Sequence, residues 1–124
     1  MALLDVQVAC LANQSMNYLY GDQVPQRMGN AHPNTVPYQE FPTEDGHMIL
    51  AVGNDGQFAR FCQAAGRDEW AEDERFRSNA ARLAHRAELV EMIRRVTLTR
   101  STRAWVQLLE QHAVPCGPIN TVRE

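Results

Sequence analysis

The residue types best suited to chemistry lie together in one polar stretch, residues 29–34 (GNAHPN). This stretch contains His32, whose imidazole can gain or lose a proton near neutral pH. The wider segment 23–37 contains three prolines and shows no helix or strand periodicity. Long segments of this kind in compact domains are typically functional or disordered. From the residues alone, a ligand-binding loop and an ordinary surface loop are equally good interpretations.

A second candidate is the turn at residues 53–56 (GNDG), which joins an apolar run to an amphipathic one. Phosphate groups bind where a strand leads into a helix N-terminus. Asp55 would repel a phosphate, however, and glycine and asparagine are the residues that a tight turn requires. We therefore favour a helix cap here, with Asn54 and Gln57 as a capping box. Asp5 and Asp45 have similarly plain interpretations, as an exposed helix position and a turn residue.

The residue types and their spacing exclude several kinds of chemistry. The chain has no lysine, which excludes a phosphate-loop lysine and a Schiff-base nucleophile. The four histidines show no metal-ligand spacing, so we expect no metal site. The three cysteines are widely spaced and form no disulfide pattern, which indicates a reducing, cytoplasmic setting. Cys62 is expected in the core, and Cys116, between two prolines, has no neighbour that would lower its pKa.

The composition is that of a globular protein with one core. The chain has 124 residues, 44% of them hydrophobic, and a net charge of -3. Its 12 basic residues do not exceed its 15 acidic ones, so we expect no nucleic-acid partner. No apolar run approaches the roughly 20 residues that span a bilayer, and the start does not resemble a signal peptide. The sequence therefore predicts a cytoplasmic protein without a membrane partner.

The predicted strands lie in the middle of the chain and at its end. A helix is expected from residue 2 to about residue 19, followed by the long loop. Two β-like runs flank an Asp-Gly turn, which predicts a hairpin over residues 38–52. The second run is the more apolar and is expected to be the more buried strand. A two-stranded hairpin is marginal by itself, so we expect a third strand from the extended segment after Val114.

The remaining segments predict helices. Residues 58–65 have helical spacing and end at Gly66, a short turn is expected near residues 69–71, and a longer helix is expected from residue 78 or 79 to residue 98. A last helix begins after Ser101 and carries His112 on its apolar face. The arginines of the 75–100 region are interpreted as a solvated face: Arg82, Arg86, Arg94 and Arg95. The fold class is α+β, a short antiparallel sheet packed on several helices.

From residue 29 onward, the sequence resembles the family III CoA-transferases. This is the group of formyl-CoA transferase, the carnitine CoA-transferases and the α-methylacyl-CoA racemases. The resemblance is carried by an ordered series of blocks: residues 29–38 (GNAHPNTVPY), 41–47 (FPTEDGH), 50–58 (LAVGNDGQF), 76–82 (FRSNAAR) and 114–120 (VPCGPIN). The opening residues 3–5 (LLD) resemble the helix between the two domains of that family.

The resemblance implies that this chain is a part of a longer enzyme. Residues 1–20 would be the linking helix and residues 21–124 the small domain, while the large Rossmann-like domain would lie outside the chain. In the family, an aspartate upstream of the segment matched by residues 3–5 attacks an acyl-CoA thioester. It then forms an aspartyl-CoA thioester that a carboxylic acid collects. No residue here matches that aspartate, so the chain is expected to be inactive alone.

The implied partners are an acyl-CoA and a carboxylic acid, with coenzyme A as part of the substrate and no bound cofactor. A homodimer of the full-length protein is also implied. Two alternatives stay open: a racemase of the same family, and a stand-alone acyl-CoA-binding or interaction module.

The resemblance also points to the site residues. In formyl-CoA transferases a glycine-rich loop of the small domain covers the active site, and by position it corresponds to residues 31–37. Here the sequence HPNT replaces the glycines, so a stiffer loop is expected. We expect five residues to line the active site: Asn30, His32, Pro33, Asn34 and Tyr38.

Overall fold

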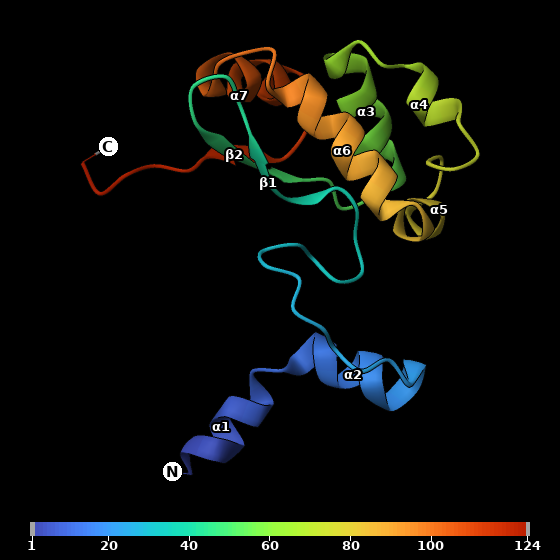
Figure 1. Cartoon of the computed structure of the whole chain (residues 1–124), viewed down its shortest axis with the longest axis vertical. Helices are drawn as coiled ribbons and strands as arrows, with labels where there is room; N and C mark the ends of the chain where they lie inside the picture. The colour runs from blue at the N-terminus through green and yellow to red at the C-terminus, as the bar shows by residue number, and fades with distance from the viewer. Residues whose placement is uncertain (1, 124) are drawn as a thin grey trace.

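The computed structural model describes residues 2–123, which form a body and a projecting arm (Figure 1). The arm consists of α1 (Leu3–Ala9) and α2 (Ala12–Gly21). A segment without helix or strand, residues 22–37, joins it to the body. The body contains three strands and five helices among these residues: β1 (Tyr38–Pro42), β2 (His47–Ala51), α3 (Asp55–Ala65), α4 (Glu69–Glu72), α5 (Asn79–Ala84), α6 (Arg86–Thr97), α7 (Thr102–Gln111) and β3 (Cys116–Pro118).

The three strands form one antiparallel sheet in the order β1-β2-β3. The hairpin pairs Tyr38 with Ala51 and Pro42 with His47. The third strand comes from the segment after Val114, as the sequence predicts, and it pairs Leu50 with Cys116. β2 is therefore the central strand, and it is the more buried strand of the hairpin.

The core lies between this sheet and the helices. The sheet contributes Phe41, Met48 and Leu50, all with no exposed surface. α6 packs against β1, and α7 packs against β2 and β3. The helices contribute side chains at helical spacing: Phe58, Phe61, Cys62, Leu89, Ile93, Trp105 and Leu109. The α+β fold class expected from the sequence is thus confirmed.

Local capping sets where the helices begin and end. Asn54 Oδ1 accepts a hydrogen bond from Gln57 N at 2.9 Å, and the Gln57 side chain in turn accepts one from Gly53 N at 2.6 Å. Ser78 and Ser101 cap α5 and α7 in the same way. Gly66 ends α3 with φ of 65°, a conformation that side chains rarely adopt. The cap interpretation of residues 53–56 is confirmed.

Two helices predicted as continuous are broken. The first is interrupted at Cys10 and Leu11, where the hydrogen bonds change from four-residue to three-residue spacing. The second is interrupted at His85, whose φ of -111° is not helical. These breaks leave the apolar periodicity almost unchanged, so the spacing of apolar residues did not reveal them.

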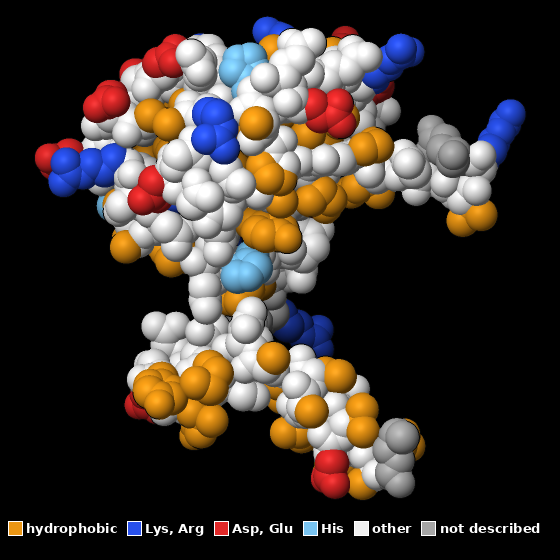
Figure 2. Space-filling view, turned by 180° about the vertical axis from the view of Figure 1, so that it is seen from behind, with side chains coloured by type: hydrophobic (Ala, Val, Ile, Leu, Met, Phe, Trp, Pro, Cys, Tyr) orange, Lys and Arg blue, Asp and Glu red, His pale blue; other side chains and the backbone are white. Residues whose placement is uncertain are grey.

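The arm exposes the apolar residues that the sequence places at helical spacing. α1 and α2 have no buried residue. Figure 2 shows hydrophobic side chains gathered on this arm, and the most exposed of them are Leu3, Leu4, Leu19 and Tyr20. An amphipathic helix normally turns such residues toward a core. Among residues 2–123, no helix is long and apolar enough to cross a membrane.

Candidate functional site

Side chains of α5 and α6 hold the loop at residues 31–37 by its backbone. Asn79 Nδ2 donates to Asn34 O at 2.8 Å, and its Oδ1 accepts from Val36 N at 3.2 Å. Arg82 Nε donates to Val36 O at 2.7 Å. Arg86 Nη2 donates to the carbonyl oxygens of residues 32 and 33, both at 2.9 Å. We call these three side chains, Asn79, Arg82 and Arg86, the backing of the loop. Their hydrogen bonds restrain the loop backbone in addition to the restraint that its prolines provide.

Arg82 is the centre of this backing and has no exposed surface. Its Nη1 donates to Phe76 O at 2.8 Å, and its Nη2 pairs with Asp55 Oδ1 at 2.8 Å. The guanidinium also stacks over the ring of Phe58, 4.4 Å from the centroid. The interpretation of the arginines as a solvated face is therefore wrong for Arg82, and wrong for the half-buried Arg86. It is correct for Arg94 and Arg95, which are exposed.

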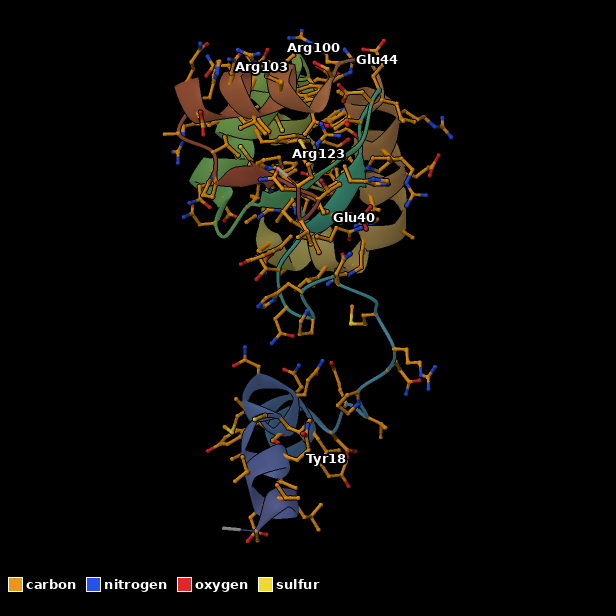
Figure 3. All side chains as sticks on the ribbon, turned by 90° about the vertical axis from the view of Figure 1, so that its left-hand side faces the viewer. Tyr18, Glu40, Glu44, Arg100, Arg103 and Arg123 are labelled. Atoms are coloured by element: carbon orange, nitrogen blue, oxygen red, sulfur yellow. The ribbon has the colours of Figure 1, made fainter. Side chains whose placement is uncertain are left out.

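Val36 of the loop is buried in the core, whereas the side chains of His32, Asn30 and Tyr38 are exposed or partly exposed. The ring of His32 stacks on that of Tyr38, with centroids 5.2 Å apart. Asn30 bonds Glu40 twice: it donates to the carboxylate at 3.0 Å and accepts from the backbone N at 3.1 Å. In Figure 3, Glu40 lies on β1 and Tyr18 on the arm, on either side of the connecting segment. Asn30, His32 and Tyr38, three of the five predicted site residues, thus lie together at β1.

Asn34 and Pro33 lie against the arm instead. Asn34 and Asn17 of α2 exchange hydrogen bonds through their side-chain amides, at 2.9 and 3.2 Å. The arm and the loop enclose a cleft of about 690 Å³, lined among others by Met16, Tyr20, Pro33 and Arg86. The five predicted residues therefore divide into two groups: Asn30, His32 and Tyr38 beside β1, and Pro33 and Asn34 at this cleft.

Sequence reasoning missed Asn17, Asn79 and Arg86. The last two, with Arg82, have the helical spacing i, i+3 and i+7 in the sequence, although the break at His85 places Arg86 on α6 and the other two residues on α5. That spacing was readable, but polar residues on one helix face ordinarily indicate contact with solvent. Asn17 gave no signal, because its partner Asn34 is 17 residues away.

Cys62, Cys116 and His112 are buried or half-buried. Burial raises the pKa of Cys62 to about 12 and also raises that of Cys116, so both thiols stay protonated. His112, predicted to be packed, is half-buried, and its ring bonds the Leu108 carbonyl at 2.9 Å. Within the part of the chain that the structure describes, no three His, Cys, Asp or Glu side chains are placed to hold a metal ion.

Asp45 links the hairpin turn to α7, at a second cleft of about 590 Å³. Its Oδ1 accepts from the backbone N of Thr102 at 2.7 Å and from the hydroxyl of Thr102 at 2.9 Å. These bonds lower the pKa of Asp45 below its ordinary 3.8. A carboxyl with a lowered folded-state pKa stabilises the fold above its unfolded-state pKa, and this stabilisation is lost as the pH falls through the folded-state value.

We therefore expect Asp45→Asn to destabilise the chain at pH 7 and to lose this effect in acid. The difference in unfolding midpoint between wild type and variant should shrink below the ordinary Asp pKa of 3.8, because the wild-type carboxyl then becomes neutral too. Denaturant titrations over a series of pH values measure it. Asp68→Asn is the matched control, since Asp68 makes no side-chain cap bond to α4. A difference that is constant with pH would contradict the expectation.

Comparisons with known proteins agree on one family. The model described as CoA-transferase family III matches residues 1–124. The succinate–glutarate CoA-transferase of Agrobacterium fabrum is 53% identical over 124 residues, which are 100% of this chain and 31% of that protein. The succinyl-CoA:glutarate CoA-transferase of Mus musculus is 38% identical over 122 residues, 98% of this chain and 28% of that protein.

A solved structure is also similar to this chain. It is a CaiB/BaiF family protein from Brucella suis, with a TM-score of 0.80 and 47% identity, and the match covers 99% of this chain and 32% of that one. The chain thus spans about a third or less of the length of the proteins it matches.

Proposed function

Since the chain belongs to CoA-transferase family III, we propose that the full-length protein transfers CoA between an acyl-CoA and a carboxylic acid. The observation that supports this most directly is the loop at residues 31–37, held from behind by Asn79, Arg82 and Arg86. Activated acyl intermediates must be kept from water, and a wall held in place serves that purpose. We propose that the active site is lined by five residues of this loop and its flanks: Asn30, His32, Pro33, Asn34 and Tyr38.

The reaction we propose proceeds through an aspartyl-CoA thioester. An aspartate oxygen attacks the thioester carbonyl, the carbon–sulfur bond breaks, and CoA leaves as a thiolate, which gives a mixed anhydride of the aspartate and the acyl group. The thiolate then attacks the aspartyl carbonyl of the anhydride and releases the first carboxylic acid. The incoming carboxylate attacks the aspartyl thioester, and the returning thiolate converts the second anhydride into the new acyl-CoA and free aspartate. Every bond broken is balanced by one formed, so no oxidant or other cofactor is needed.

We assign the attacking aspartate of this reaction to a part of the protein outside these 124 residues. The aspartates best held in place already have structural partners: Asp45 bonds Thr102, Asp55 pairs with Arg82, and Asp73 pairs with Arg75. Among residues 2–123, no aspartate lines the cleft between the arm and the loop. The chain by itself would therefore be inactive.

The division into arm and body supports the domain assignment that the resemblance implies. Residues 1–20 would be the linking helix, and residues 21–124 the small domain. The apolar surface of α1 and α2 favours further protein packed on the arm, as in a full-length homodimer. The free thiols Cys10, Cys62 and Cys116 favour the cytoplasm.

The test uses the full-length protein in heavy water, with a panel of acyl-CoA donors and free carboxylic acids that includes succinyl-CoA and glutarate. We expect new acyl-CoA species by mass spectrometry, and none with the 124-residue chain alone. Deuterium at the α-carbon without acyl exchange would instead identify a racemase. The absence of both would favour a binding module.

A further inference from the structure

Three contacts hold His32 in one orientation. Its backbone N donates to Tyr38 O at 2.9 Å, and its backbone O accepts from Arg86 Nη2 at 2.9 Å. Its ring stacks on the ring of Tyr38, with centroids 5.2 Å apart and an angle of 23° between the ring planes. A side chain restrained at its backbone and across its ring presents its polar atoms in a fixed direction, as a preorganised site requires.

A hydrogen bond within the loop assigns the tautomer of His32. The backbone N of Asn34 donates to His32 Nδ1 at 3.1 Å. Because a backbone N–H group can only donate, Nδ1 accepts through its lone pair, and the ring proton of the neutral imidazole is on Nε2. A doubly protonated ring would lose this bond, since both of its nitrogens are donors. In this geometry, His32 is therefore a neutral hydrogen-bond donor through Nε2.

The donor atom Nε2 is open to a ligand. It has no hydrogen-bond partner among residues 2–123, where the one buried side-chain N or O atom without a partner is Arg86 Nη1, so Nε2 of His32 keeps exposed surface. The neighbouring acid on this surface, Glu40, has other neighbours. Asn30 Nδ2 donates to one of its carboxylate oxygens at 3.0 Å, and His47 Nε2 lies 3.4 Å from the other. The Nε2–H group of His32 is thus available to an acceptor outside the described chain.

The proposed reaction needs a donor of this kind and does not need a base. Its nucleophiles are carboxylates and a thiolate, which are already anions, so no proton has to be removed from them. Negative charge develops on the oxygen of each carbonyl group that is attacked, and a fixed N–H group stabilises this charge more in the transition state than in the ground state. Arg82 cannot supply this donor, because it has no exposed surface.

We propose that His32 is a catalytic residue, whose Nε2–H group donates a hydrogen bond to the carbonyl oxygen of the acyl group while the thioester is attacked. This inference rests on the proposed function and gives a role to one of the residues proposed to line the active site. The carbonyl oxygen gains negative charge when the nucleophile adds, and the charge leaves with the thiolate when the carbon–sulfur bond breaks. The ring proton stays on Nε2 throughout, because Nδ1 remains bonded to Asn34 N.

The test compares two substitutions of His32 in the full-length protein. Asparagine places an oxygen near the position of Nδ1, so His32→Asn keeps the acceptor for Asn34 N and lacks the donor. Glutamine places an N–H group near the position of Nε2, so His32→Gln keeps a donor and lacks the acceptor. With succinyl-CoA and glutarate as substrates, we expect His32→Asn to lower kcat about 100- to 1,000-fold with little change in KM. His32→Gln should lower kcat about 10-fold or less.

The matched control is His47→Asn, at an exposed position of β2 on the same side of the sheet. It should transfer CoA at the wild-type rate. If His32→Asn and His32→Gln lower kcat equally, the ring of His32 has a structural role only, and the inference is overturned.

Infrared spectroscopy of a bound acyl-CoA analogue gives a readout that does not depend on turnover. A methylene group replaces the thioester sulfur in this analogue, so its carbonyl group stays intact, and an isotopic label marks that carbonyl. We expect a lower carbonyl stretching frequency in wild type and His47→Asn than in His32→Asn, because an accepted hydrogen bond weakens the carbonyl double bond. Equal frequencies in wild type and His32→Asn would overturn the inference.

The two measurements separate this inference from the proposed function. Transfer of CoA by His32→Asn at the wild-type rate would support the function and reject the role of His32. A wild-type protein that transfers no CoA, but binds the analogue with a carbonyl frequency that depends on His32, would support the donor and reject the function. A protein that neither transfers CoA nor binds the analogue would reject both.

Discussion

Replacing Arg82 by methionine is expected to lower the free energy of unfolding of the 124-residue chain by about 3–5 kcal/mol. The buried guanidinium donates to Val36 O and Phe76 O, and methionine would leave both carbonyl oxygens without this donor. Each unsatisfied buried acceptor costs about 1–3 kcal/mol. The contact with the ring of Phe58 is lost as well.

Urea denaturation followed by circular dichroism measures this change. Arg94→Met is the control, because Arg94 is exposed on α6 and its replacement should change stability by no more than about 0.5 kcal/mol. Amide hydrogen exchange gives an independent readout: protection in residues 32–37 should fall in Arg82→Met and stay the same in Arg94→Met. Equal stability of the two variants would contradict the stabilising role given to Arg82.

The second large effect is expected at Trp105, which is 1% exposed between α7 and the sheet. Trp105→Ala should cost about 3–5 kcal/mol, because it removes a large core side chain and leaves a cavity. The indole Nε1 also donates to Thr97 O at 2.8 Å, and this bond ties α7 to the end of α6. Arg100 lies over the ring, 5.2 Å from its centroid.

Two further variants divide this effect into its parts. Trp105→Phe keeps most of the apolar volume and removes the bond to Thr97 O, so it should cost about 1–3 kcal/mol. Leu98→Ala, at a residue that is 48% exposed, should cost little. Denaturation followed by circular dichroism applies to all three variants. If Trp105→Phe were as damaging as Trp105→Ala, the hydrogen bond and not the core packing would dominate.

Local patterns in the sequence were sufficient to predict most helices and strands of the body. The hairpin and its turn follow from Asp45-Gly46 between two β-like runs, and the starts of α3, α5 and α7 follow from Asn54, Ser78 and Ser101. These signals act between residues close in the chain, so the sequence displays them directly. The third strand required one further step, since the hairpin needed a partner.

The candidate site depended on contacts between distant residues, which no local pattern reveals. Arg82 bonds Val36 across 46 positions, and Arg86 bonds the loop across 53 and 54. In the sequence these arginines have the spacing of a solvent-exposed helix face. In the structure that face is covered by the loop, whose carbonyl groups take the place of water.

The sequence by itself determined the α+β class, the hairpin and the family resemblance, because periodicity, caps and ordered motif blocks are all properties of neighbouring residues. Only the tertiary structure decided which polar side chains are buried and which face a cleft. Burial depends on what the rest of the chain places against a residue. The same residue type is an exposed charge at Arg94, a buried guanidinium paired with the exposed carboxylate of Asp55 at Arg82, and at Arg86 a half-buried charge without a neutralising partner among residues 2–123.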